Sequence, residues 1–139
     1  MTKRQTKEQE RAKYAWDCVE KAQTTLNDKA SDYGNLARGL PGYIQTNGLG
    51  QTLAFLLSKG KNDPTKPHQQ LYLHLSKWTT KQLGWGESEE LMKELTNRTS
   101  ADYRHTTNEV MALLVWLRRF AEAQLVKDDE QGGNNVAAT

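Results

Sequence analysis

Cysteine, proline and long apolar runs are all scarce in this chain of 139 residues. Its one cysteine, Cys18, excludes an intrachain disulfide and fits a reducing compartment. No stretch approaches the roughly 20 uncharged apolar residues of a membrane-spanning helix. The opening residues, MTKRQTKEQERAKY, lack the apolar core of a secretory signal. We therefore expect a cytoplasmic protein without a membrane partner.

The residue patterns of common catalytic and metal sites are also missing. His68, His74 and His105 have no second histidine or cysteine at ligand spacing, whereas a zinc site needs three or four converging ligands. The GLG at 48–50 lacks the preceding strand and the third glycine of a dinucleotide-binding fingerprint. We expect no catalytic residue, metal, cofactor or small-molecule substrate. Cys18 is predicted to be a buried inert thiol, and His74 and His105 to lie at or near the surface.

Apolar residues recur at three- and four-residue steps along most of the chain, which indicates helices. The fold predicted from this pattern is all-α, a compact single-domain bundle of about five or six helices. The helical domain is predicted at residues 1–126, with a mobile polar tail at 127–139. Helices are predicted at about 6–26, 49–60, 67–83, 88–95 and 100–126. Within the last one, VMALLVWL is predicted to be buried on all sides.

The segment LPGYIQTNGLGQTLAFLLSKG, residues 40–60, combines four glycines and a proline with many apolar residues. Because glycine costs about 1 kcal/mol in a helix interior, we expect breaks here. The turn formers NDKASDYGN should end the first helix, followed by a short helical turn at 33–38. Pro41 is predicted to open a further short helix. Gly48 is predicted to take a positive φ and to turn the chain before the next helix.

Basic and aromatic residues offer candidate contacts with a partner. Five lysines and one aspartate lie between residues 57 and 83, and Gln70, His74, Lys77 and Lys81 follow each other at helical steps. Such a row can bind phosphates without reading bases, although a solvated helix face explains it as well. Three tryptophans, at 16, 78 and 116, are predicted to lie in the core. Trp85, between two glycines, is predicted to be exposed.

Three blocks, NGLGQTLAFLLSK, LYLHLSKW and YRHTTNEVMALLVWLRRFAEA, resemble the small helical subunit of the Cmr effector complex, the type III-B CRISPR–Cas machine that targets RNA. The resemblance covers most of residues 10–124. It implies a compact all-α subunit without enzymatic activity, whose copies stack into a short filament beside the subunits that hold the guide RNA. The implied partners are other Cmr subunits, further copies of the chain, and guide and target RNA. Base pairing then selects the sequence.

The leading hypothesis is thus a non-catalytic subunit of an RNA-guided ribonucleoprotein that contacts RNA. One alternative is a protein–protein assembly module that does not touch RNA. Another is a small helical nuclease, against which the missing catalytic pattern argues. The candidate phosphate contacts, chosen by charge and position, are Arg38, Lys59, Lys61, Lys77, Lys81, Arg104, Arg118 and Arg119.

Overall fold

The computed structural model describes residues 4–125 and confirms a compact all-α fold. Its elements are α1 (Lys7–Leu26), the 3₁₀ turn η1 (Asn27–Lys29), α2 (Ala30–Asn47), α3 (Leu49–Gly60), α4 (Pro67–Gln82), α5 (Leu91–Thr96) and α6 (Ser100–Gln124). The predicted tail lies outside the described residues, as does residue 126 at the predicted end of the last helix. None of the helices in residues 4–125 has the length and apolar character that crossing a bilayer requires.

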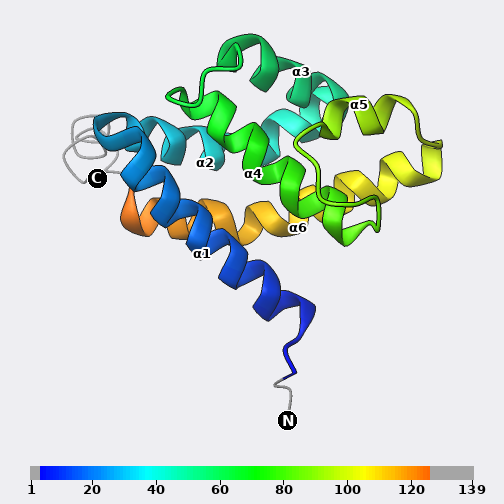
Figure 1. The fold of residues 1–139 in the computed structure, drawn as a ribbon, viewed down its shortest axis with the longest axis horizontal. Coiled ribbons are helices and arrows are strands. Elements are labelled where there is room, and N and C mark those ends of the chain that lie inside the picture. The colour runs from blue at the N-terminus through cyan, green and yellow to red at the C-terminus, as the bar shows by residue number, and fades with distance from the viewer. Residues whose placement is uncertain (1–3, 126–139) are drawn as a thin grey trace.

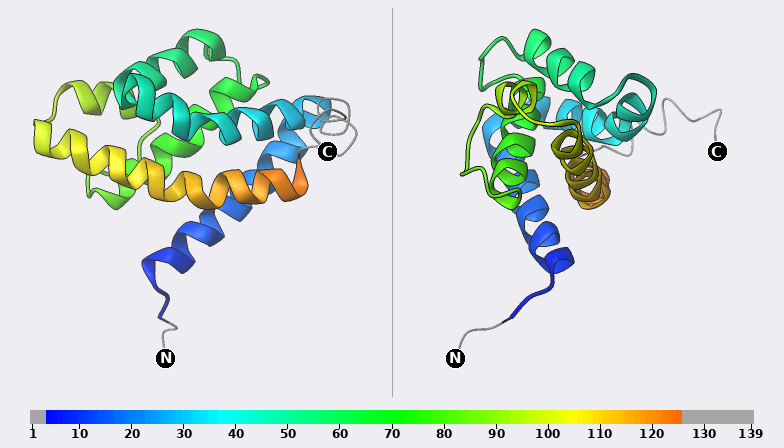
Figure 2. Two further views of the ribbon diagram at one scale, coloured as in Figure 1. Left: turned by 180° about the vertical axis from the view of Figure 1, so that it is seen from behind. Right: turned by 90° about the vertical axis from the view of Figure 1, so that its right-hand side faces the viewer.

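Helix α4 lies in the middle of the bundle and contacts all five other α-helices (Figure 1). Helices α2 and α6 lie side by side, as the view from behind in Figure 2 shows. Helix α1 packs across α6, and its first turns project beyond the rest of the molecule in every view (Figures 1 and 2). The core is built largely from leucines that are fully buried: Leu49, Leu53, Leu56, Leu71, Leu75, Leu113, Leu114 and Leu117.

Helix α1 starts where the sequence predicted, because Thr6 and Gln9 cap it reciprocally. Thr6 Oγ1 accepts a hydrogen bond from the backbone N–H of Gln9 at 3.1 Å. Gln9 Oε1 accepts one from the backbone N–H of Thr6 at 2.8 Å. This capping box satisfies two N–H groups that would otherwise have no partner at the helix start.

Helix α2 differs most from the prediction. The first helix ends at Leu26, as predicted. Helix α2 then runs unbroken through Gly34, Gly39, Pro41 and Gly42, so the predicted short turn at 33–38 and the separate helix opened by Pro41 are wrong. An interior proline costs about 3 kcal/mol. Burial of one large apolar side chain stabilises a fold by roughly 1.5–3 kcal/mol, and α2 buries several of them along its inner face. Its buried apolar residues are Ala30, Tyr33, Ala37, Leu40 and Ile44. Packing therefore outweighs the local preference for a break.

Two glycines are required where α3 begins and ends. Gly48 is the junction between α2 and α3, and its φ of 87° confirms the predicted positive φ. Gly60 ends α3 against α4, where an added Cβ would lie 2.6 Å from Gln69 Oε1 and 2.9 Å from Gln69 Cα and N. A side chain at residue 60 would therefore collide with the backbone of α4. The missing side chain lets these two helices approach so closely.

Helix α6 is buried along one face only, whereas the sequence predicted burial around the whole segment 110–117. Val110 and Leu114 are fully buried, but Val115 is 61% exposed. The helix lies at the edge of the bundle, where α1 and α2 cover its inner side (Figure 2). Because the segment 110–117 is apolar around the whole helix, its outward-facing side chains, such as Val115, are exposed to solvent.

Candidate nucleic-acid interface

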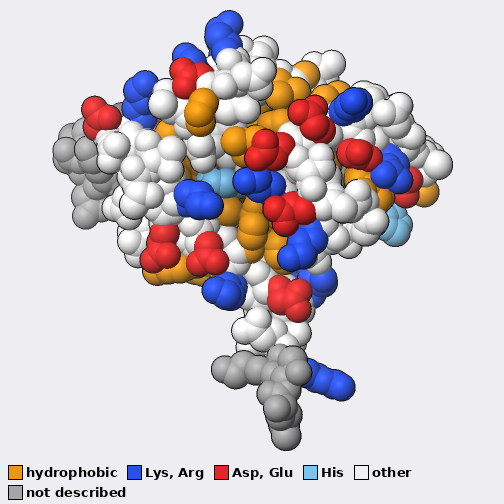
Figure 3. Space-filling view, in the orientation of Figure 1, with side chains coloured by type: hydrophobic (Ala, Val, Ile, Leu, Met, Phe, Trp, Pro, Cys, Tyr) orange, Lys and Arg blue, Asp and Glu red, His pale blue; other side chains and the backbone are white. Residues whose placement is uncertain are grey.

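The eight predicted phosphate contacts are distributed over four helices. Arg38 lies on α2, Lys59 on α3 with Lys61 directly after it, Lys77 and Lys81 on α4, and Arg104, Arg118 and Arg119 on α6. All are exposed except Lys77 and Arg118, which are half-buried. Figure 3 shows Lys and Arg side chains interspersed with Asp and Glu over the face formed by α1 and α4. This face has mixed charge and is not uniformly cationic.

Two of the eight residues have a carboxylate neighbour. Lys77 Nζ lies 3.3 Å from Glu89 Oε2, and Arg38 Nε lies 3.9 Å from Glu122 Oε2. Both pairs are partly exposed, and such pairs contribute only about 0–1 kcal/mol. The other six have no acidic oxygen within 4.0 Å among the described residues. Their charge is therefore not neutralised by an ion pair within the part of the chain that the structure describes.

A polar cluster joins α1, α4 and α6 beside this face. The guanidinium of Arg11 donates from Nε and Nη2 to the two carboxylate oxygens of Glu109, at 2.8 and 3.0 Å. The indole N–H of Trp78 donates to Glu109 Oε2 at 2.8 Å. Burial raises the pKa of Glu109, but the hydrogen bonds from Arg11 and Trp78 outweigh it and hold the pKa below its ordinary value. One carboxylate thus connects three helices.

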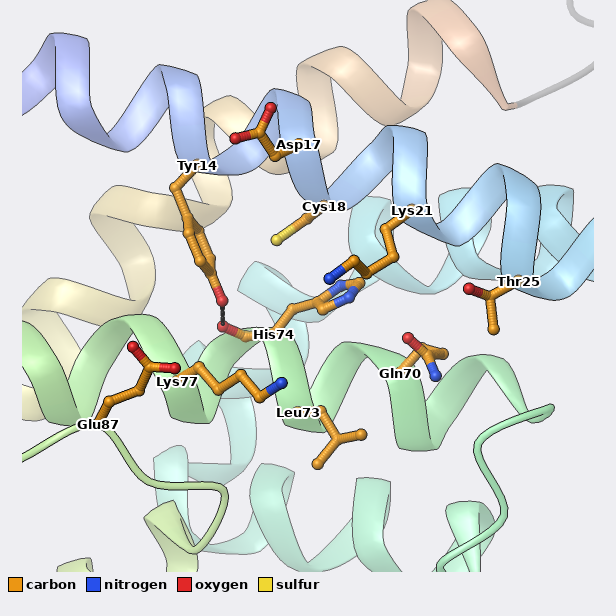
Figure 4. A pocket seen from close by; sticks show the side chains of 10 residues that line it. All are labelled: Tyr14, Asp17, Cys18, Lys21, Thr25, Gln70, Leu73, His74, Lys77 and Glu87. Carbon is orange, nitrogen blue, oxygen red and sulfur yellow. Dashed lines mark hydrogen bonds between the residues drawn. The ribbon is translucent and has the colours of Figure 1, made fainter.

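A cavity of about 360 Å³ lies between α1 and α4 (Figure 4). Helix α1 contributes Lys21 and Tyr14, α4 contributes His74 and Lys77, and Glu87 follows α4 in the chain. At one end the Tyr14 hydroxyl donates to the backbone carbonyl of His74 at 2.6 Å. The helical spacing placed His74 and Lys77 on one side of α4, and both line this cavity. No local pattern indicated that α1 covers much of that side.

His74 is buried, which corrects the prediction of a position at or near the surface. Its side chain is 5% exposed, and Nδ1 lies 2.6 Å from the Tyr33 hydroxyl. Nε2 is shielded from water and has no hydrogen-bond partner within the described residues. Burial, with a smaller contribution from the charges of Lys21 and Lys77, lowers the pKa of His74 to about 3. The imidazole is therefore neutral at physiological pH. Its partner Tyr33 is 41 residues away in the chain, beyond the reach of local periodicity.

The burial of Cys18 and of two tryptophans can be compared with their predicted positions. Burial raises the pKa of Cys18 to about 12, which confirms a buried, protonated thiol. Trp85 is half-buried, with the Arg98 guanidinium 4.2 Å from its ring centre, so the prediction of an exposed indole is wrong. Trp16 is 38% exposed and not in the core, and it packs edge-on against Phe120 at 5.1 Å. In residues 4–125, no three His, Cys, Asp or Glu side chains are grouped as metal ligands.

Comparison with known proteins supplies the family. Residues 7–124 match the family model described as CRISPR-associated protein (Cas_Cmr5). The chain belongs to the Cmr5 family. A curated relative, the CRISPR system Cmr subunit Cmr5 of Thermus thermophilus, is 30% identical over 118 residues, which are 85% of this chain and 95% of the relative. The crystal structure of a CRISPR-associated Cmr5 family protein from Thermus thermophilus has a TM-score of 0.71 and 30% identity, and the match covers 89% of this chain and 100% of that one.

The Cmr5 match extends from α1 to α6 and confirms the family that the three sequence blocks resembled. The first block covers the α2–α3 junction and most of α3, the second lies in α4, and the third lies in α6. These blocks hold leucines of the central core, including Leu53, Leu71 and Leu113. The segments that carried the resemblance therefore include much of the central core.

Proposed function

We propose that this Cmr5 family protein is a non-catalytic subunit of a cytoplasmic Cmr complex, an RNA-guided CRISPR effector. Copies of the chain stack with each other and with other Cmr subunits beside the guide RNA, and together they hold the target RNA along it. The observation that carries this proposal is the family match over residues 7–124, which spans the whole described bundle. The Thermus thermophilus relative, named as a Cmr subunit, supports the same assignment.

The exposed basic groups support a contact with the RNA backbone. We retain Arg38, Lys59, Lys61, Lys77, Lys81, Arg104, Arg118 and Arg119 as candidate phosphate contacts. Lys59 and Lys61 are the most suitable of them for a test. Both are exposed at the end of α3, and no carboxylate of the described residues lies within 4.0 Å of either. Contacts of this kind bind phosphates without distinguishing sequences.

The test is a Cmr complex assembled with wild-type protein or with the double variant Lys59→Ala, Lys61→Ala. RNA retention is measured across a salt titration. Loss of two phosphate contacts is expected to weaken retention at low salt and to reduce the slope of log affinity against log salt by about 1–2. Lys13→Ala is the matched control, because Lys13 is exposed and already paired with Asp17 at 3.5 Å. An unchanged slope in a fully assembled complex would exclude these two lysines.

An apolar surface on α1 and α6 favours the second candidate, a protein–protein assembly module without direct RNA contact. Trp16 and Val115 are 38% and 61% exposed, and Trp16 packs against the half-buried Phe120. Aromatic side chains are enriched in the cores of protein–protein interfaces. If the protein is such an assembly module, the double variant Trp16→Glu, Val115→Glu fails to enter the complex. The Lys59 and Lys61 double variant still enters the complex and leaves RNA retention unchanged.

The absence of catalysis is tested directly. Purified protein is incubated with labelled RNA and with Mg²⁺ or Mn²⁺, and the RNA is examined for cleavage. The proposal predicts intact RNA. Cleavage that follows the protein through successive purification steps would replace the proposal with an enzymatic function.

A further inference from the structure

The cavity between α1 and α4 has a cationic end, where Lys77, one of the candidate RNA contacts, lies with Lys21 and His74, to which the proposed function assigns no role. In Figure 4 the Lys21 ammonium lies beside the His74 imidazole, and the Lys77 side chain extends along α4 on the same side of the cavity. Lys21 is exposed and has no carboxylate within 4.0 Å among the described residues. Lys77 is half-buried, and its Nζ forms an ion pair with Glu89 Oε2 at 3.3 Å. The Lys21 ammonium therefore lies beside a ring that is itself nine-tenths buried, and the positive charge of Lys77 also acts on that ring.

The hydrogen bond to Tyr33 determines what the imidazole offers to this cavity. Tyr33 is fully buried, and its hydroxyl lies 2.6 Å from His74 Nδ1. A buried hydroxyl needs an acceptor for its proton, and an unprotonated Nδ1 provides it. The neutral ring then carries its proton on Nε2. The opposite arrangement would leave both the hydroxyl proton and Nε2 without a partner. Nε2 is thus an N–H donor without an acceptor in the described part of the chain.

The carboxylates of the cavity lie away from this donor. Asp17 and Glu87 are found toward the Tyr14 end in Figure 4, and the charge of Glu87 contributes to the raised pKa of Tyr14 after burial and Cys18. At His74 the pKa is lowered by burial and then by the charges of Lys21 and Lys77. Of these two lysines, Lys77 is partly neutralised by Glu89 at 3.3 Å, whereas Lys21 has no carboxylate within 4.0 Å among the described residues. The His74 end of the cavity therefore favours negative charge.

We propose that this end of the cavity binds the oxyanion of a phosphate group, through the ammonium groups of Lys21 and Lys77 and the Nε2–H of His74. A cavity of about 360 Å³ lies at the small end of the range of roughly 300–1,000 Å³ for ligand pockets. Nε2 is shielded while the Lys21 side chain rests beside the ring. Because Lys21 is exposed, rotation about its own bonds opens the ring edge and brings the ammonium to the same anion. The ligand is either a free phosphate or a phosphodiester of RNA.

The experiment is a titration of the full-length ¹⁵N-labelled protein with inorganic phosphate at constant ionic strength, followed by NMR. A long-range ¹H–¹⁵N spectrum first identifies the protonated nitrogen of His74, which is expected to be Nε2. Phosphate is then expected to cause saturable shifts of the His74 ring and of the amides of Lys21 and Lys77. Lys21→Met is expected to weaken binding about fivefold, which corresponds to one ion contact near 4 Å in water. The matched control is Lys29→Met, because Lys29 is exposed at the end of η1 and does not line this cavity.

A second variant tests the role of Lys77 in the opposite direction. Glu89→Gln removes the carboxylate that competes for the Lys77 ammonium, so phosphate binding is expected to tighten about twofold to fivefold. Both Lys21 and Glu89 are exposed, and their variants are expected to fold. Linear, unsaturated shifts, a proton on Nδ1, or equal affinities of the wild type and Lys21→Met would overturn the proposal.

A third arm replaces phosphate by a short single-stranded RNA with no terminal phosphate. If the RNA shifts the same His74 signals and Lys21→Met weakens both ligands, the phosphate group belongs to RNA. If inorganic phosphate alone shifts these signals, the pocket binds free phosphate. The proposal does not depend on the proposed function, because inorganic phosphate tests it without RNA or other subunits. Conversely, RNA retention in the Cmr complex is tested at Lys59 and Lys61, which do not line this cavity.

Discussion

Replacement of Gly60 by alanine tests the closest approach between two helices. The new Cβ would meet Gln69 Oε1 at 2.6 Å, which a side-chain movement can relieve, and Gln69 Cα and N at 2.9 Å, which it cannot. Overpacking of this kind costs about 1–3 kcal/mol, and backbone contact places Gly60→Ala in the upper half of that range. The higher helix propensity of alanine returns about 1 kcal/mol. We expect a net loss of roughly 1–2 kcal/mol in the free energy of unfolding.

Gly39→Ala provides the matched control for this experiment. Gly39 is an exposed residue inside α2, and an added Cβ there has no atom within 4 Å. The same chemical change should therefore stabilise the protein by about 0.5–1 kcal/mol. Urea denaturation followed by circular dichroism measures both variants against the wild type. If Gly60→Ala matches or exceeds the stability of the wild type, α3 and α4 do not pack as closely as described.

Two further predictions concern charge and pH. Glu109→Gln is expected to lower the free energy of unfolding by about 1–3 kcal/mol at pH 7, because Arg11 and Trp78 lose a charged acceptor. Because the folded-state pKa of Glu109 is depressed, the stability difference between wild type and variant should shrink as the pH falls below 4.5. Urea denaturation at a series of pH values measures this difference, and a difference that does not change with pH would refute the prediction. His74 has a folded-state pKa of about 3 against an ordinary 6.5, so its neutral form stabilises the fold above pH 6.5 and this contribution is lost as the pH falls. Between pH 6.5 and 5 the wild type should lose about 1.5 kcal/mol more than His74→Gln, whose amide can still accept the Tyr33 proton; parallel pH curves would contradict a buried neutral imidazole.

Local sequence patterns predicted the helices that have clear ends and a clear apolar face. The apolar period and the turn formers that follow residue 26 placed α1, and the glycine at residue 48 and the proline at residue 67 marked the starts of α3 and α4. Helix α2 was missed because its glycines and Pro41 favour breaks locally, while its inner face is stabilised by contacts with α6, α3 and α4. Those contacts join residues far apart in the chain, so no local window contains them.

The surface was harder to predict than the helices, for a related physical reason. Helical periodicity shows which residues share a side of a helix, but it does not show which neighbouring helix covers that side. His74 was expected near the surface because nothing nearby indicates that α1 covers it. Trp16 and Val115 were expected in the core because apolar residues usually are, yet both are exposed. Trp85 is covered by Arg98, which lies 13 residues later in the chain and carries no apolar signal.

The first turns of α1 project from the rest of the molecule in Figure 1, but Glu109 connects this helix to α4 and α6 through hydrogen bonds from Arg11 and Trp78. If α1 left the bundle, this carboxylate would keep only the indole N–H of Trp78 as a partner, and Arg11 would lose both of its hydrogen bonds. A tag joined before Thr6 extends into solvent and should be harmless. Truncation beyond Arg11 removes the guanidinium from a half-buried anion, so a chain shortened there is expected to unfold more readily although most of its leucine core remains.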